Sequence, residues 1–553
     1  NAPALSQQEQ EELRAIQKDK MELRERFYAP LAFGTAGLRG TMKVGLHHMN
    51  VHVVRWVTQG FAEVICAESD WAGDRKAAVC MDGRKNSRRF AEAAAEVLAA
   101  NGITVYLFDG PTPELSFAVR AYGCLAGINI TASHNPKEYN GYKAYWCDGA
   151  QLQTETAMAV SARLEEIDVF AGPKRMDLQR GIELGRICLL GRSCDEAYLK
   201  AVEELSTVWP GMEADKEKVK IVYTPLHGCG YQLVPEILCR TGLQRLLCEP
   251  SQMVLDGDFS TVESPNPEYP ESFARAAELA IRENADLILG TDPDCDRVGL
   301  LVRGPSGKFL PLSGNQTGVL LLDYICAGRI EKGTMPKNPV AVKSIVSTPL
   351  ADAVAEHYGV ELRSVLTGFK WIGDQIAQLE AADEVDRFIF GFEESYGYLA
   401  GPYVRDKDAV IGSMLICEMA AYYRSIGSSL KQRMEEIYAQ YGRYLNKVDS
   451  FEFPGLSGMD KMSALMQGLR DKPLTEIAGH TIVKVTDYQK PEETGLPAAN
   501  VLIYKLDNGE TVVVRPSGTE PKIKIYYTTL GKNLEDAEAE KEKLAEALKP
   551  IMA

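Results

Sequence analysis

Short apolar runs and longer amphipathic stretches follow one another along most of the chain, which predicts strands that alternate with helices. Runs typical of buried strands lie at 125–130, 219–223, 286–290 and 387–390. Stretches of helical length lie at 195–205, 317–325 and 409–423. The rhythm predicts an α/β fold, and each strand-like run leads into a polar turn. In open α/β sheets, ligands bind at the carboxyl ends of the strands.

Both ends of the chain depart from this rhythm. Residues 6–9 (Ser-Gln-Gln-Glu) form a capping box that opens one charged helix running to about Arg26. From about Tyr444, alternating strands are followed by one terminal helix at 533–548. We therefore expect four units, at 1–200, 201–311, 312–443 and 444–553.

The composition narrows the class of protein. The 553 residues suffice for several domains, and 45% hydrophobic with 25% charged residues is typical of a soluble globular protein. A net charge of −16 argues against a nucleic-acid-binding surface. No long uncharged apolar span predicts a membrane helix. The 12 cysteines include no C-x-x-C pair, and Cys66, Cys80, Cys239 and Cys417 are interpreted as small core residues in a reducing cytoplasm.

The first polar turn contains a candidate nucleophile. Ser133 lies in Thr131-Ala132-Ser133-His134-Asn135-Pro136, directly after the strand predicted at 125–130. A serine hydroxyl is a weak nucleophile that needs a base, a metal or a cation. The alternative is an ordinary turn serine that caps the next helix.

A second turn, 291–297, places Asp292, Asp294 and Asp296 at alternating positions after the strand predicted at 286–290. Three such carboxylates can converge on one cation, and all-oxygen ligands suit Mg²⁺. A calcium loop does not fit, because Arg297 stands where that loop requires glycine and Arg303 where it requires glutamate. Three unrelated surface acids are the alternative.

Further turns combine polar groups in other ways. Gly391 to Gly397 carries Glu393 and Ser395, which suit neighbouring sugar hydroxyls, although acids also favour a helix start. Arg515 to Thr519 has the composition of a phosphate cradle, with a plain hairpin as the alternative. The glycine-rich turn around Arg39 connects two elements or contacts phosphate.

A dinucleotide site is not expected. Gly228-Cys229-Gly230 begins like its fingerprint, but Leu233 stands where the third glycine belongs.

The four turns at Ser133, at Asp292 to Arg297, at Gly391 to Gly397 and at Arg515 to Thr519 together suggest phosphoryl transfer on a phosphosugar. In this order they resemble the α-D-phosphohexomutase superfamily, in its phosphoglucomutase branch, over essentially the whole chain. The resemblance implies a heart-shaped molecule of three related α/β domains with mixed sheets and a smaller α+β C-terminal domain around a cleft.

The resemblance also implies the site. Ser133 would be carried as phosphoserine, with Mg²⁺ bound by its phosphate and by Asp292, Asp294 and Asp296. A phosphosugar, α-D-glucose 1-phosphate, would become glucose 6-phosphate through glucose 1,6-bisphosphate. Substrate contacts would come from Thr35, Arg297, Thr367, Gly368, Glu393, Ser395, Arg515, Ser517, Gly518 and Thr519.

A base must also move the hydroxyl protons. Our preferred candidate is Lys370, followed by Lys143 and then His134, with Arg39 beside the phosphoserine. A lysine near a metal and Arg39 would have its pKa lowered by like charge.

Several alternatives stay open. The loop Gly-Phe-Glu-Glu-Ser-Tyr-Gly lacks the terminal histidine of the dual glucose/mannose branch, which favours glucose over phosphomannomutase activity. The Gly-Thr-Ala-Gly-Leu-Arg turn resembles the branch with phosphopentomutases and glucose-1,6-bisphosphate synthases, so ribose phosphates remain candidates. The chain has no Gly-x-Ser-x-Gly elbow of a serine hydrolase. A phosphatase, or a non-catalytic phosphosugar-binding protein, is a further class. We expect a cytoplasmic monomer or weak homodimer.

Overall fold

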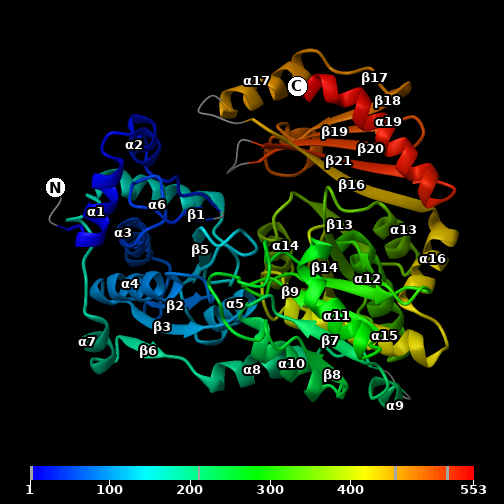
Figure 1. The fold of residues 1–553 in the computed structure, drawn as a ribbon, viewed down its shortest axis with the longest axis horizontal. Helices are drawn as coiled ribbons and strands as arrows, with labels where there is room; N and C mark the ends of the chain where they lie inside the picture. The colour runs from blue at the N-terminus through cyan, green and yellow to red at the C-terminus, as the bar shows by residue number, and fades with distance from the viewer. Residues whose placement is uncertain (1–3, 36, 209–211, 454–457, 518–521, 553) are drawn as a thin grey trace.

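The computed structural model describes residues 4–552 except 36, 209–211, 454–457 and 518–521. Its strands form four sheets, each drawn from one stretch of the chain (Figure 1). Three sheets combine parallel and antiparallel strands with helices, and the fourth is wholly antiparallel. The predicted class, α/β units with mixed sheets and an α+β C-terminal unit, is confirmed. The domain limits remain a prediction.

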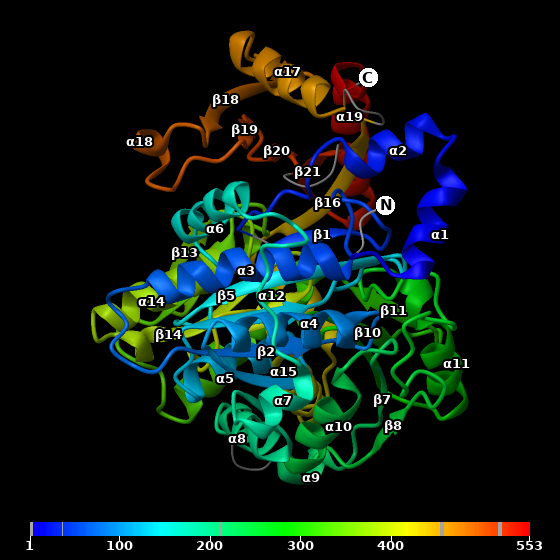
Figure 2. The same cartoon turned by 90° about the vertical axis from the view of Figure 1, so that its left-hand side faces the viewer.

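The first sheet has the strand order β1-β5-β4-β2-β3-β6. Its strands are β1 (Leu38–Thr41), β2 (Lys76–Met81), β3 (Thr104–Asp109), β4 (Ala126–Ile130), β5 (Tyr139–Trp146) and β6 (Ile187–Leu189). Its helices are α3 (Val51–Ala67), α4 (Ser87–Ala100), α5 (Thr112–Ala121), α6 (Thr154–Glu166) and α7 (Leu178–Glu183). Helices α3 and α6 lie on one side and α5 on the other (Figure 2).

Strand β2 shows why the predicted strand runs are mostly apolar rather than alternating. Ala77, Val79 and Met81 point into the core with α3 and α4, whereas Ala78 and Cys80 point toward α5. Since successive side chains of a strand face opposite sides, a strand covered on both sides is apolar at nearly every position.

The expected single N-terminal helix is two helices, α1 (Gln7–Ile16) and α2 (Lys20–Phe27). The capping box at Ser6 is present, as predicted. The first helix ends at Ile16 because Asp19 starts a new one. The Asp19 carboxylate accepts hydrogen bonds from the backbone N–H groups of Met21 and Glu22.

The second sheet has the order β11-β10-β9-β7-β8 and the third β13-β12-β14-β15. The second contains β7 (Ile221–Thr224), β8 (Leu246–Cys248), β9 (Leu287–Thr291), β10 (Val298–Arg303) and β11 (Phe309–Leu312). The third contains β12 (Val340–Ser344), β13 (Glu361–Val365), β14 (Phe388–Glu393) and β15 (Gly397–Leu399). Around them lie α8 (Arg192–Glu203), α9 (Glu213–Lys216), α10 (Gly230–Arg240), η1 (Pro270–Phe273), α11 (Ala274–Arg282), α12 (Gly314–Glu331), α13 (Leu350–His357), α14 (Lys370–Ala381), η2 (Val385–Arg387), α15 (Ala409–Ser425) and α16 (Leu430–Tyr441).

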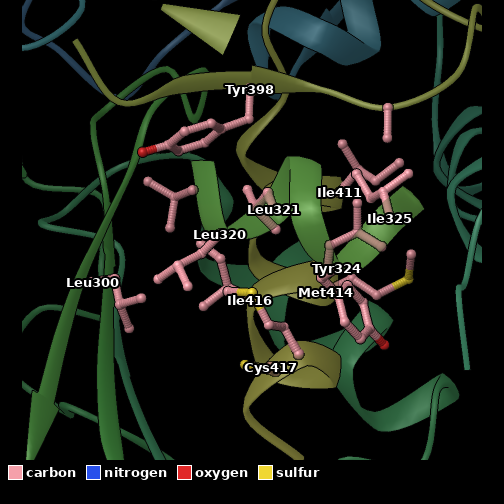
Figure 3. Packing of buried hydrophobic residues seen from close by; sticks show 14 of the residues in the cluster. Leu300, Leu320, Leu321, Tyr324, Ile325, Tyr398, Ile411, Met414, Ile416 and Cys417 are labelled. Atoms are coloured by element: carbon pink, nitrogen blue, oxygen red, sulfur yellow. The ribbon is translucent and has the colours of Figure 1, made fainter. Parts of the chain in front are cut away.

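One hydrophobic core serves both of these sheets. It extends from Tyr198 to Tyr438 and joins helices α10, α12 and α15. Helix α15 is buried almost all round because it packs against α10 of the second unit and β15 of the third. Figure 3 shows the centre of this core, with Leu320, Leu321 and Tyr324 of α12, Ile411, Met414 and Ile416 of α15, Leu300 of β10 and Tyr398 of β15.

The fourth unit stands beside the third (Figure 1). Its sheet has the order β16-β21-β20-β19-β18-β17. The strands are β16 (Arg443–Glu452), β17 (Glu476–Ile477), β18 (His480–Asp487), β19 (Leu502–Leu506), β20 (Thr511–Pro516) and β21 (Lys522–Gly531). The expected terminal helix is α19 (Leu534–Met552), but α17 (Gly458–Asp471) and the short α18 (Pro491–Thr494) are additional helices.

Two sequence expectations about the surface can be compared with the structure. Cys80 and Cys417 are buried, whereas Cys66 and Cys239 are exposed, so only the first two are core residues. Within the described residues, no helix combines the length and the apolar character needed to cross a membrane.

Candidate active site

Ser133 lies where the sequence predicts it, just beyond the carboxyl end of β4. Its backbone is left-handed, with φ 51°, and the Thr131 hydroxyl accepts its N–H at 2.9 Å. The Ser133 hydroxyl donates to Asp292 Oδ2 at 2.7 Å and lies 3.1 Å from His134 Nδ1. The turn therefore aims the hydroxyl at the aspartate cluster of the second unit.

Arg84, which was not predicted from the sequence, fixes this turn by hydrogen bonds. Its buried guanidinium donates to the carbonyl oxygens of Ser133, Asn135, Pro136 and Tyr139. Arg84 also pairs with Asp82, Nε to Oδ2 at 3.2 Å. One cation thus satisfies four carbonyl groups and sets the shape of the serine turn. The sequence feature that could have indicated Arg84 is its position just after the buried strand β2.

We expect Arg84→Met to lower kcat about 100-fold, since misplacement of a reacting group by about 1 Å can cost that much. The free energy of unfolding should fall by about 3–5 kcal/mol, because Asp82 loses its buried partner. Steady-state kinetics and thermal unfolding check both values. Arg88→Met, on the exposed face of α4, is the matched control. Unchanged kcat in Arg84→Met would contradict the positioning role.

Asp292, Asp294 and Asp296 converge as predicted. All three are fully buried, and one oxygen of each lies within 4.8 Å of the others. Asp294 Oδ1 and Asp296 Oδ1 are buried without a hydrogen-bond partner among the described residues. Asp292 Oδ2 has the Ser133 hydroxyl as its partner. An all-oxygen set with two unsatisfied carboxylate oxygens fits a hard divalent cation.

The glycine turn 228–230 supports this cluster. A Cβ at Gly228 would lie 2.5 Å from Pro293 Cα, and Cys229 N–H donates to the Pro293 carbonyl at 2.9 Å. The glycine is therefore needed for close packing against the aspartate turn.

Two lysines share the aspartate cluster. Lys143 Nζ lies 2.7 Å from Asp294 Oδ2 and 3.0 Å from Asp296 Oδ2. Lys407 Nζ, from the third unit, lies 2.8 Å from Asp296 Oδ2. Burial lowers the pKa of Lys143, but the two carboxylates outweigh burial and raise it overall. Three units of the chain therefore meet at these charges.

His134 and Arg39 flank the serine. Burial, followed by the positive charges of Arg297 and Arg39, holds the pKa of His134 well below its ordinary value, so its ring is neutral. Arg39 lies on β1, and its guanidinium donates to Asn135 Oδ1 at 2.9 Å. Arg297 pairs with Glu268 at 2.6 Å.

The predicted sugar loop joins β14 to β15. Glu393 is buried and accepts the Gly368 N–H at 2.6 Å, whereas Ser395 is partly exposed. Burial, followed by the charge of Glu394, raises the pKa of Glu393 to about 7. The Thr367 hydroxyl is buried without a partner among the described residues. The sugar loop is therefore tied to the turn before α14, where the Thr367 hydroxyl is left unsatisfied among the described residues.

A cleft of about 440 Å³ lies between the start of α14 and the fourth unit, and Glu393 and Ser395 of the sugar loop are not among its lining residues. Thr35, Thr367, Lys370, Arg515 and Ser517 line it, and so bring three units together. Ser133 and the aspartates are not among its lining residues. Gly518 and Thr519 fall outside the described residues.

Lys370 faces the cleft rather than the aspartates. Its Nζ lies 4.5 Å from the centre of the Trp371 ring, and burial lowers its pKa. Of the two lysines named from sequence, the structure places Lys143 at the aspartate cluster, and it adds Lys407, which sequence reasoning missed.

Comparison with known proteins gives matches along the chain. Residues 30–170, 196–306 and 313–441 match the models of phosphoglucomutase/phosphomannomutase alpha/beta/alpha domains I, II and III. A phosphoglucomutase of Staphylococcus aureus (strain MSSA476) is 37% identical over 533 residues, covering 94% of this chain and 93% of its own. The parafusin (phosphoglucomutase) structure from Paramecium, in its open form, superimposes with a TM-score of 0.70 at 18% identity, covering 94% of this chain and 95% of its own.

Proposed function

The chain belongs to the phosphoglucomutase/phosphomannomutase family, and we propose that it is a phosphoglucomutase that interconverts α-D-glucose 1-phosphate and glucose 6-phosphate. One observation carries the proposal: the Ser133 hydroxyl lies 2.7 Å from Asp292 in a buried cluster of three aspartates. A nucleophile at a divalent-cation site is the arrangement that phosphoryl transfer requires.

In the proposed cycle, Ser133 carries a phosphoryl group. A sugar hydroxyl attacks its phosphorus, the new P–O bond forms, and the bond to Ser133 Oγ breaks. The glucose 1,6-bisphosphate produced turns in the cleft and returns its other phosphoryl group to Ser133. Mg²⁺, held by Asp292, Asp294 and Asp296, would neutralise charge on the transferring group.

The other residues of the proposed site would bind and orient the sugar. Glu393 and Ser395 would form hydrogen bonds with its hydroxyl groups, next to Thr367 and Gly368. Arg515 and Ser517, with Gly518 and Thr519, would hold the phosphate that is not transferred. Thr35 and Arg297 would complete the contacts. Movement of the fourth unit would release the intermediate to turn.

The attacking hydroxyl must lose a proton, and we propose Lys370 as the base, then Lys143 and His134. The lowered pKa of Lys370 supports placing it before Lys143, whose pKa is raised, because a lysine accepts a proton only when neutral. We expect Lys370→Ala to lower kcat about 100- to 1,000-fold. Lys143→Ala and Lys407→Ala, measured alongside, are the comparisons. Near-normal turnover in Lys370→Ala with loss in Lys143→Ala would reverse the order.

Substrate choice is tested by assaying glucose, mannose and ribose 1-phosphates side by side with Mg²⁺ and catalytic glucose 1,6-bisphosphate. We expect glucose 1-phosphate to have the highest kcat/KM. A preference for ribose phosphate would keep the mechanism and identify a phosphopentomutase. No turnover of any sugar by a folded, phosphorylated protein would favour a non-catalytic phosphosugar-binding protein.

The cellular compartment and oligomeric state of the enzyme are also proposed here. We infer a cytoplasmic protein, a monomer or weak homodimer, that acts on free phosphosugars. The thiols support a reducing compartment, because all 12 cysteines are unpaired in the described chain.

A further inference from the structure

The fourth unit contains a second group of potential metal ligands. His480 opens β18, Glu510 immediately precedes β20 and Glu540 lies on α19. One ligand atom of each lies within 4.8 Å of the others. Strand β20 separates Glu510 from the Ser517 turn at its other end, and six residues of strand span about 20 Å. The cluster is therefore distinct from the phosphate-binding turn.

Glu510 has an unsatisfied oxygen inside this cluster. The residue is 1% exposed, and its Oε1 accepts the Leu530 N–H at 2.9 Å. Its Oε2 is buried and has no hydrogen-bond partner among the described residues. A buried carboxylate oxygen without a donor is unfavourable. A bound cation would satisfy it.

The neighbours orient the other two ligands. His480 Nε2 lies 2.8 Å from Glu540 Oε1, while its Nδ1 lies 3.4 Å from Asp507 Oδ1. A metal-bound histidine usually donates its other ring N–H to such a carboxylate. Lys543 Nζ holds Glu540 Oε2 at 2.8 Å, which leaves Oε1 facing His480.

We propose that His480 Nε2, Glu510 Oε2 and Glu540 Oε1 bind one divalent cation of the Zn²⁺ class. One imidazole nitrogen and two carboxylate oxygens suit Zn²⁺, with bonds of about 2.0–2.2 Å. Tetrahedral bonds of that length place the donors about 3–4 Å apart. Binding therefore requires Glu510 to approach and the 2.8 Å contact between His480 and Glu540 to open slightly. The ion joins α19 to the hairpins that precede β18 and β20. The alternative is an ion pair between protonated His480 and Glu540, with no metal.

The test uses the full-length protein, stripped of metals and returned to excess Mg²⁺ to occupy the aspartate cluster. Zn²⁺ is then titrated by calorimetry into wild type, Glu510→Gln and His480→Gln. The matched control is Glu476→Gln, an exposed acid on the neighbouring strand β17. We expect both cluster variants to bind Zn²⁺ at least about 30-fold more weakly than wild type and the control, because each loses a direct ligand and loss of an outer partner alone costs about 10- to 100-fold. Zn²⁺ should raise the Tm of wild type and of the control only.

Two further measurements test whether His480 is a ligand and whether the aspartate cluster contributes to Zn²⁺ binding. Co²⁺ bound to wild type should give a visible absorption band that His480→Gln lacks. Asp292→Asn, which alters the other cluster, should keep the Zn²⁺ affinity. If Glu510→Gln does not fold, His480→Gln decides, because His480 is partly exposed. Equal Zn²⁺ affinity in wild type and the folded cluster variants, or no binding in wild type, would overturn the proposal and leave the ion pair.

Discussion

Replacement of Ser133 by alanine should reduce isomerisation by about four orders of magnitude or more, because loss of a covalent nucleophile removes the step that carries the transferred group. The fold should persist, since alanine fits the space of serine and the turn is held by Arg84 through backbone carbonyls. Incubation with ³²P-labelled glucose 1,6-bisphosphate should label wild type and leave Ser133→Ala unlabelled.

Ser425→Ala provides the matched control, because Ser425 is exposed at the end of α15 and its hydroxyl donates to the Tyr422 carbonyl. It should retain wild-type turnover and labelling. If Ser133→Ala turned over at more than about one-tenth of the wild-type rate, another group would carry the phosphoryl, and the assignment of Ser133 would be wrong.

The second large effect should follow from loss of the metal. Chelation with EDTA, or Asp292→Asn, should lower kcat about 1,000-fold or more, because a catalytic cation supplies several kcal/mol of charge stabilisation. Added Mg²⁺ should restore the chelated wild type but restore Asp292→Asn only in part. Turnover that survives exhaustive chelation would contradict the proposed metal site.

In the absence of metal, replacing Asp292 and replacing Asp296 should have different effects on the free energy of unfolding. Burial, followed by repulsion from Asp294 and Asp296, raises the pKa of Asp292 well above its ordinary value. A carboxylate with a raised pKa destabilises the fold as pH rises above its unfolded pKa, so Asp292→Asn should keep or increase the free energy of unfolding at pH 7. Asp296→Asn should reduce it by about 3–5 kcal/mol, because Lys143 and Lys407 would lose a buried partner. Denaturant unfolding in EDTA measures both.

The sequence predicted the elements that have a strong local pattern. The runs at 125–130, 219–223, 286–290 and 387–390 are observed as β4, β7, β9 and β14, because strands covered on both sides are mostly apolar. The split of the N-terminal helix was missed, since Asp19 as a cap differs little from Asp19 as a surface charge. The aspartate cluster was predictable because its three members are close in sequence.

Residues whose partners are distant in sequence were not predictable in this way. Arg84 binds carbonyl groups 49 to 55 residues away, and Lys407 reaches Asp296 from another unit. A single buried cation has no local pattern that separates it from a surface one. Lys370 illustrates the converse: it was selected by its motif, yet it faces the cleft while Lys143 and Lys407 occupy the aspartate cluster.

The core shared by the second and third units has a consequence for biosynthesis. Helix α10 packs against α15, whose first residue is synthesised about 170 residues after the last residue of α10. Translation at about 5–20 residues per second delays this contact by on the order of ten seconds or more. During that interval α10 can pack on α8 and β8 but lacks the native partner that covers the rest of its apolar face. We therefore expect this part of the chain to expose apolar surface while it is being made.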